Sequence, residues 1–153
     1  MEVKIINFPE IKVAVLEHHG SPETEHESVK KLIAWRIENK LSFDKHQSYG
    51  VHYNDPSKTR SDLYKVDLCI SVETDVPKNS YGVINKVIPS GRCAMVRHIG
   101  SRENITSAKF LYEQWLPNSG EKLRDFPIFF HYVNIGPDIK VEEMITDVYL
   151  PLQ

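Results

Sequence analysis

Two stretches that lie 80 positions apart decide how this sequence is organised: Lys12-Val-Ala-Val-Leu-Glu-His-His-Gly-Ser21 and Arg92-Cys-Ala-Met-Val-Arg-His-Ile-Gly-Ser101. In this alignment an alanine, a histidine, a glycine and a serine coincide. The same offset places Trp35 on Trp115, whereas His52-Tyr53 meets His131-Tyr132 at an offset of 79. A match that continues in register indicates an internal repeat. We therefore predict an ancient duplication, with half-repeats at about 1–75 and 80–153.

Each half shows the same order of secondary-structure signals. Ile11, Val13 and Val15 alternate with other residues as in a half-buried strand, and Ser21 is a good N-cap for the helix that follows it. The remaining strands are expected at 48–53, 63–72, 81–99 (bent near 89–91), 128–134 and 141–150, and a second helix at 101–116. This order predicts an α+β fold of two βαββ units, with a mostly antiparallel sheet, two helices and a pseudo-twofold axis. We expect a central cleft between the halves.

Both helices carry an apolar stripe that should face the core. The first stripe comprises Val29, Leu32, Ile33 and Ile37, at helical spacing. Trp35 lies off this stripe, so we expect it to flank the core. The second helix has the corresponding stripe Ile105, Ala108, Tyr112, Trp115 and Leu116, and Pro117-Asn-Ser-Gly120 should stop it.

The composition is that of one globular domain over residues 1–153. It is 41% hydrophobic, with 19 basic and 21 acidic side chains and a net charge of −2. This balance gives no electrostatic reason to bind nucleic acid, and no apolar run has the roughly 18 residues needed to cross a membrane. Without a signal-like N-terminus, and with Cys69 and Cys93 isolated in apolar surroundings, the chain is expected to be cytoplasmic with reduced thiols.

The sequence lacks the common motifs of catalysis and cofactor binding. It has no GxSxG elbow, P-loop, GxGxxG, HExxH or EF-hand loop. His18, His19 and His26 could approach a metal, but their spacing is not that of a ligand set, and hydrogen-bonded or solvated histidines are the simpler interpretation. We therefore predict no catalytic residues, no metal site and no cofactor.

Aromatic residues, in contrast, are abundant on the expected strands. Tyr49, Val51 and Tyr53 share one strand face, and we expect Ile128, Phe130 and Tyr132 to occupy the matching face of the second half. Each aromatic side chain could simply belong to the core. As a set they suit a pocket for a flat or apolar molecule, because tyrosine joins an apolar ring to a hydroxyl that needs a partner. The predicted ligand-binding residues are Trp35, Tyr49, Tyr53, Tyr64, Trp115, Phe130, Tyr132 and Met144.

Four segments together resemble the GyrI-like small-molecule-binding domains, a family that includes DNA gyrase inhibitory proteins and the effector-binding domains of AraC-type regulators. The segments are Gly50-Val-His-Tyr-Asn-Asp-Pro56, Ile88-Pro-Ser-Gly-Arg-Cys-Ala-Met-Val-Arg-His-Ile-Gly100, Trp115-Leu-Pro-Asn-Ser-Gly120 and Thr146-Asp-Val-Tyr-Leu-Pro-Leu152. The resemblance covers the whole chain. It implies paired βαββ units that bind a small aromatic or cationic molecule in the cleft between the halves.

The resemblance also implies a glutamate on the strand after the Pro-Asn-Ser-Gly turn, where it neutralises a cation or assists hydrolysis. Phe130 stands at the expected position. A phenyl ring attracts a cation only through its quadrupole, by roughly 0.5–2 kcal/mol. We therefore expect the domain to prefer neutral aromatic ligands, with Phe130 lining the cleft close to Tyr64, Met144 and a tryptophan.

Three functions remain open from the sequence. The first is a stand-alone protein that binds an apolar or aromatic small molecule, in toxin or drug resistance or in the modulation of DNA gyrase. The second is a hydrolase of a reactive electrophile, for which Tyr53, Tyr64 and His131 are the visible acid–base candidates. The third is an interaction module that contacts gyrase directly. Because the domain fills the chain, no helix-turn-helix is expected.

Overall fold

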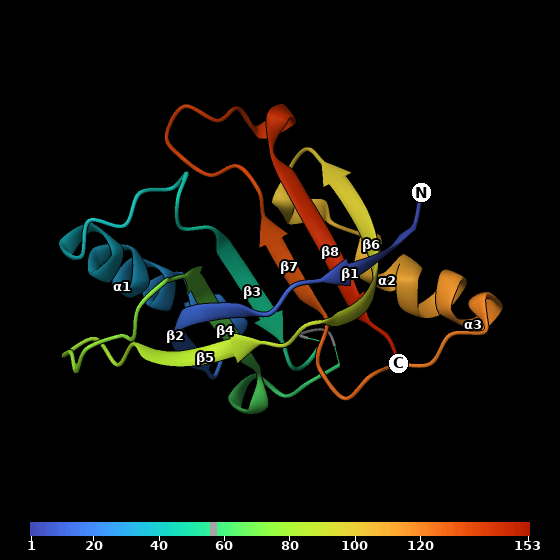
Figure 1. Ribbon diagram of the computed structural model, residues 1–153, viewed down its shortest axis with the longest axis horizontal. Helices are drawn as coiled ribbons and strands as arrows, with labels where there is room; N and C mark the ends of the chain where they lie inside the picture. Colours follow the sequence, from blue (N-terminus) through green and yellow to red (C-terminus); the bar gives the residue numbers. More distant parts are fainter. Residues whose placement is uncertain (56–57) are drawn as a thin grey trace. The chain divides into compact units, whose positions relative to one another are not determined.

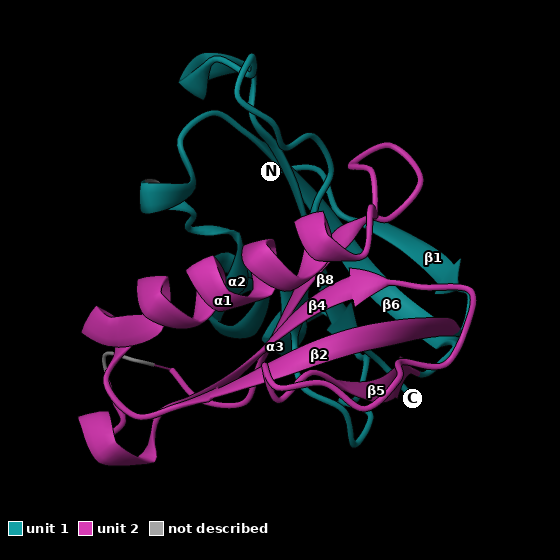
Figure 2. Ribbon diagram, turned by 90° about the vertical axis from the view of Figure 1, so that its left-hand side faces the viewer, with its two compact units in different colours: residues 1–10, 89–153 teal, residues 11–88 magenta. Residues whose placement is uncertain are grey.

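The computed structural model describes residues 1–55 and 58–153, except for the side chain of Asn104. The chain forms two compact units, which Figure 2 shows in different colours. Unit 1 comprises residues 1–10 and 89–153, and unit 2 comprises residues 11–88. Unit 2 is therefore inserted between two parts of unit 1.

Unit 2 is a four-stranded antiparallel sheet with one helix. Its strands are β2 (Ile11–His19), β3 (Ser48–His52), β4 (Lys65–Ser71) and β5 (Ile84–Ile88), paired in the order β5-β2-β4-β3. Helix α1 (Glu25–Glu38) packs against β2 and β4 (Figure 1). Two 3₁₀ turns, η1 (Pro22–Thr24) and η2 (Ser61–Leu63), precede α1 and β4.

Unit 1 repeats this plan with a shorter, irregular helical segment. Its strands are β1 (Lys4–Phe8), β6 (Gly91–Ile99), β7 (Phe129–Tyr132) and β8 (Ile145–Pro151), in the antiparallel order β1-β6-β8-β7. The helical segment consists of α2 (Ser107–Phe110), the π-helical turn η4 (Leu111–Trp115) and α3 (Leu116–Ser119). The 3₁₀ turns are η3 (Arg102–Asn104) and η5 (Val141–Glu143). The predicted α+β class with antiparallel strands and two helical regions is confirmed.

Strand pairing in the two units follows one register. Asp67 pairs with Glu17 and Val51, and Asp147, 80 positions later, pairs with Arg97 and His131. The predicted offset of 79 for His52-Tyr53 is therefore wrong, because β3 and β7 also correspond at 80. Strand β1, absent from our expectations, takes in unit 1 the place that β5 takes in unit 2. The duplication itself stays a prediction.

Ser21 and Ser101 both act as N-caps, but of the 3₁₀ turns η1 and η3; helices α1 and α2 begin later, after Thr24 and Thr106. The Ser21 and Ser101 hydroxyls accept hydrogen bonds from the backbone N–H groups of Glu23 and Glu103, at 3.1 and 3.2 Å. His18 Nε2 lies 2.9 Å from the Ser21 carbonyl, and His98 makes the same contact with Ser101 at 2.8 Å. Each histidine thus makes a hydrogen bond to the turn that follows its strand. For His18 this agrees with the interpretation as a hydrogen-bonded histidine.

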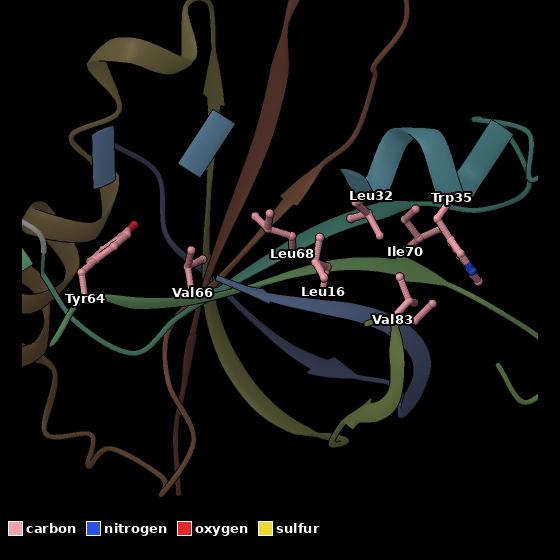
Figure 3. Close-up of a cluster of buried hydrophobic side chains, with 9 residues drawn as sticks. Leu16, Leu32, Trp35, Tyr64, Val66, Leu68, Ile70 and Val83 are labelled. Atoms are coloured by element: carbon pink, nitrogen blue, oxygen red, sulfur yellow. The ribbon is translucent and has the colours of Figure 1, made fainter. Parts of the chain in front are cut away.

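The core of unit 2 lies between α1 and its sheet (Figure 3). Helix α1 buries Leu32, Trp35 and Arg36, whereas Val29, Ile33 and Ile37 are exposed. The predicted stripe is therefore wrong, because α1 turns a different face toward the sheet. Trp35, which was expected to flank the core, is 3% exposed and belongs to it. Arg36 stabilises this orientation of the helix by donating hydrogen bonds to the Leu41 carbonyl and the Ser48 hydroxyl, both at 3.0 Å.

The core of unit 1 differs from the predicted stripe at two neighbouring positions. Leu111 is fully buried among Ala94, Val96 and Val148, whereas Tyr112 is exposed. A π-helical turn has a wider backbone than an α-helix, so it shifts the side chains that face the sheet. Pro117 lies in the first turn of α3 and does not stop the helix, which ends at Gly120 in the left-handed conformation.

The other face of the unit 1 sheet carries an aromatic cluster. Phe8 of β1 packs edge-on against Phe129 and Tyr149, with ring centroids 4.9 and 5.1 Å apart, and Phe129 stacks on Tyr149 at 5.0 Å. These contacts tie β1 to the rest of unit 1.

Among the described residues, no helix is long and apolar enough to cross a membrane.

Candidate functional site

The helix face of the unit 1 sheet carries a group of large side chains that are only partly buried. Trp115 of η4 and Phe130 of β7 pack against the core of this unit, and the Tyr132 ring centroid lies 6.4 Å from that of Phe130. Met144 lies between η5 and β8, and its carbonyl accepts a hydrogen bond from Gly100 N. All four keep part of their surface exposed. We refer to Trp115, Phe130, Tyr132 and Met144 as the aromatic face.

The corresponding positions of unit 2 are filled. Trp35 and Tyr64 are buried at opposite ends of one row of core side chains (Figure 3). The Tyr64 hydroxyl donates a hydrogen bond to Glu25 Oε1 at 3.0 Å, and Gly50 stands where unit 1 has Phe130. These two predicted binding residues therefore serve the core of unit 2.

Tyr49 and Tyr53, also predicted to bind ligand, belong to the sheet face of unit 2 that lies away from α1. Tyr49 pairs with Cys69, and the Tyr53 hydroxyl donates a 2.7 Å hydrogen bond to Asp67 Oδ2. Lys86 contacts the same carboxylate oxygen at 2.8 Å, and Lys65 Nζ lies 4.4 Å from the centre of the Tyr53 ring. This arrangement is a polar cluster around a buried carboxylate.

The predicted match between Phe130 and the face of Tyr49, Val51 and Tyr53 is wrong. Phe130 pairs with Val148, a core residue on the helix face, whereas Val51 pairs with Asp67 on the opposite face. Side chains alternate along a strand, so an alignment that is wrong by one residue exchanges the two faces. Phe130 does share a core with Trp115, but Tyr64 belongs to the other unit.

The acid–base candidates Tyr64 and Tyr53 lie on opposite faces of the unit 2 sheet, Tyr64 on the helix face and Tyr53 on the face away from α1. His131 belongs to unit 1, where it pairs with Asp147, the partner of Arg97. Burial and the hydrogen bond to Asp67 raise the pKa of Tyr53 to about 12. A phenol with this pKa stays protonated at neutral pH and can act there only as a hydrogen-bond donor. Burial lowers the pKa of His131.

One charged residue beside the aromatic face was missed by sequence reasoning. The guanidinium of Arg102, in η3, lies 5.4 Å from the centre of the Tyr132 ring. Arg102 Nε donates to the Thr146 hydroxyl at 2.9 Å, and Nη2 donates to the carbonyls of Ile145 and Asn134 at 2.9 and 3.0 Å. These partners are 32–44 positions away in the chain, so the sequence gives little sign of the role of Arg102. The one local signal is that Arg102 follows Ser101 at the position where unit 2 has Pro22.

The described residues contain no group of three His, Cys, Asp or Glu side chains that could hold a metal ion. The seven histidines are thus not gathered into a ligand set within that part of the chain. Folding without a metal or cofactor stays a prediction.

An α+β domain with aromatic side chains on a partly open sheet face has the features of a small-molecule-binding domain. The model of the GyrI-like small molecule binding domain matches residues 1–153, so the chain belongs to this family. It is 42% identical to the probable transcriptional regulator YgiV of Escherichia coli (strain K12), over 99% of this chain and 96% of YgiV. It is also 29% identical to a DNA gyrase inhibitor of Erwinia billingiae (strain Eb661), over 99% of this chain and 97% of the inhibitor.

Solved structures share the fold at low sequence identity. The C-terminal domain of EcmrR superposes with a TM-score of 0.77 at 18% identity, over 99% of this chain and 97% of that domain. In the EcmrR–DNA complex this chain matches 57% of the EcmrR chain, with a TM-score of 0.78. SAV2435 bound to tetraphenylphosphonium gives a TM-score of 0.62 at 13% identity, over 100% of this chain and 94% of that chain.

Proposed function

We propose that this GyrI-like domain binds an apolar or aromatic small molecule on the aromatic face of unit 1. The observation that carries the proposal is the difference between the two units. Unit 2 buries Trp35 and Tyr64, the counterparts of Trp115 and Met144, to 3% and 4% exposure, and it has Gly50 in place of Phe130. In unit 1 Trp115, Phe130, Tyr132 and Met144 all remain partly exposed. Exposed aromatic surface beside a packed core is typical of a ligand site.

The π-helical turn supports the same location. Trp115 is the last residue of η4, and such turns occur often at functional sites because they change the direction of side chains within a helix. Trp115 thereby lies against the core on the same face as Phe130. An aromatic ligand could stack on these rings and gain about 0.5–1.5 kcal/mol for each ring pair beyond the burial of apolar area.

The names of the relatives suggest how ligand binding could be used. YgiV is named a probable transcriptional regulator and the Erwinia billingiae protein a DNA gyrase inhibitor. For this chain we propose ligand capture as the primary event, with a regulatory partner such as gyrase acting downstream. Hydrolysis is less well supported, because Tyr53 and Tyr64 lie on opposite faces of the unit 2 sheet and Tyr53 stays protonated at neutral pH.

The test is a fluorescence titration with N-phenyl-1-naphthylamine, a neutral aromatic probe that brightens in apolar surroundings. Binding should be saturable and should weaken about tenfold or more in Trp115→Ala and Phe130→Ala. Tyr112→Ala is the matched control, because this exposed aromatic residue lies on the same helical segment but outside the aromatic face. No saturable binding, or equal affinity in all four proteins, would refute the proposed site.

A further inference from the structure

Arg102 has unused hydrogen-bonding capacity next to the aromatic face. Its Nε and Nη2 groups are bound to Thr146, Asn134 and Ile145. Within the described part of the chain, Nη1 makes no hydrogen bond, and no carboxylate lies within 4.0 Å of the guanidinium. One edge of this cation is therefore fixed by the fold, and the other is available to a ligand.

The charge of Arg102 is only partly solvated. The residue is half-buried, and burial lowers the pKa of its guanidinium below the ordinary value, although the group stays charged at neutral pH. A cation that has lost part of its water and has no counter-ion gains more from an anion than an exposed one does. Because three partners already hold the side chain, binding an anion costs little additional conformational entropy.

The neighbours of Arg102 add an aromatic requirement. The guanidinium lies over the Tyr132 ring, and Phe130 lies beside that ring. Unit 2 has Pro22 at the position of Arg102 and offers no cation there. From this juxtaposition we infer that the aromatic face takes an aromatic anion, with its rings on Phe130 and Tyr132 and an anionic oxygen on Arg102 Nη1. This inference rests on the proposed function.

Two probes that differ by one charged group separate this inference from the proposed function. N-phenyl-1-naphthylamine is neutral, and 8-anilino-1-naphthalenesulfonate is the same aromatic skeleton with a sulfonate. The sulfonate should bind the unsubstituted protein about tenfold more tightly, because charge-assisted hydrogen bonds are roughly twice as strong as neutral ones. This preference should persist in 0.5 M NaCl, since partly buried pairs are poorly screened.

Arg102→Gln should reduce the affinity ratio of the two probes to about one. Arg92→Gln is the matched control, because Arg92 is an arginine of the same unit that is already paired with Glu121 at 3.0 Å; it should keep the ratio. Arg102→Lys, which retains the charge but not the planar fork, should give an intermediate ratio. Thermal unfolding without probe shows that each variant is folded.

The outcomes are distinct. Equal affinity of the unsubstituted protein for both probes would overturn the inference and leave the proposed neutral-ligand site intact. A preference that survives in Arg102→Gln would also overturn it, because the sulfonate would then bind elsewhere. Failure of N-phenyl-1-naphthylamine to bind at all would instead count against the proposed function.

Discussion

Phe130 sets the electrostatic character of the aromatic face at the level of a single residue. Its ring lies beside Tyr132 and against the core that Leu111 and Val148 form. Phe130→Glu places a carboxylate there. It should raise the affinity for tetraphenylphosphonium about tenfold, because a partly desolvated ion pair contributes more than a cation–π contact. Titration with this cation and with N-phenyl-1-naphthylamine measures the change in preference.

Phe130→Gln is the control for this substitution, since glutamine is close to glutamate in size and polarity but carries no charge. Both variants should lose some stability, because a polar group replaces a packed ring. If Phe130→Glu and Phe130→Gln show the same relative preference for the two probes, Phe130 does not contact the ligand.

Gly91 illustrates a second effect of one residue, a close approach of a side chain to the backbone. Its φ is +152°, and a Cβ there would lie 2.7 Å from Cζ of Arg124, which donates hydrogen bonds to three main-chain carbonyls of this unit. Gly136 has nearly the same φ, +150°, with open space around it. Gly91→Ala should therefore cost about 1–2 kcal/mol more than Gly136→Ala in urea unfolding. Equal costs would mean that Arg124 moves freely.

His52 should make the free energy of unfolding depend on pH. Its Nε2 atom is shielded from solvent, and burial lowers the pKa of the imidazole from 6.5 to about 4. Between these two values the unfolded state binds more protons than the folded state. The contribution of His52 to the free energy of unfolding is therefore fully present above pH 6.5 and is lost as the pH falls toward 4. In His52→Gln the loss between pH 7 and pH 5 should be smaller by about 1–2 kcal/mol.

His26→Gln is the matched control, because it makes the same histidine-to-glutamine change at an exposed position. Urea unfolding at the two pH values gives all the required free energies. A pH dependence of His52→Gln that equals that of the unsubstituted protein would show that the imidazole titrates alike in the folded and unfolded chains.

Among the elements, the helical segment of unit 1 has the most unusual geometry. Its π turn buries Leu111 and exposes Tyr112, the reverse of what an uninterrupted helical stripe predicts. Leu111→Ala should therefore cost about 2–5 kcal/mol of unfolding free energy, and Tyr112→Ala less than about 1 kcal/mol. Chemical denaturation distinguishes the two. A larger cost for Tyr112→Ala would place a regular α-helix there.

Local signals allowed most strands and the two Gly-Ser turns to be located from the sequence. Strand β1 was missed, and the strand expected over 81–99 is two strands, β5 in unit 2 and β6 in unit 1. Ser21 and Ser101 act through the backbone two residues away, so their role can be read from neighbouring residues. The faces of the helices could not be predicted in this way. Helix α1 buries Leu32 and exposes Ile33, both of them apolar. This choice depends on the hydrogen bond from Arg36 to Ser48, which lies 12 positions further along the chain.

The candidate site was predictable only in part for the same reason. Trp115, Phe130, Tyr132 and Met144 were proposed from composition, the repeat and strand alternation, but the alignment error of one residue joined them to Tyr49 and Tyr53 on the other face. Trp35 and Tyr64 are aromatic residues of the same kinds, and only their burial distinguishes them from the partly exposed residues of the aromatic face. Arg102 owes its position to long-range hydrogen bonds.

On the scale of the whole molecule, β1 makes unit 1 discontinuous in the chain. Phe8 is 5% exposed and contacts Phe129 and Tyr149. Phe8→Ala should cost about 3–5 kcal/mol. Because Phe129 and Tyr149 both belong to unit 1, amide hydrogen exchange should accelerate in β6 and β8 more than in β2 and β4.

Ile5→Ala on the same strand is the matched control, since Ile5 is exposed and should change exchange little. Equal acceleration of exchange in all four central strands by Phe8→Ala would show that the two units open only together.

The pairing of β1 with β6 also affects the order of events during synthesis. Residues 4–8 leave the ribosome before unit 2 is made, and their pairing partners at 91–95 follow 83–91 residues later. At about 5–20 residues per second, β1 waits roughly 4–18 s without its partner strand. During this interval the segment Ile5-Ile6-Asn7-Phe8 is an unpaired apolar strand that a chaperone can bind, and unit 2 can complete its own sheet from residues 11–88 without β1. Strand β1 can therefore pair with β6 only after the whole of unit 2 has been synthesised.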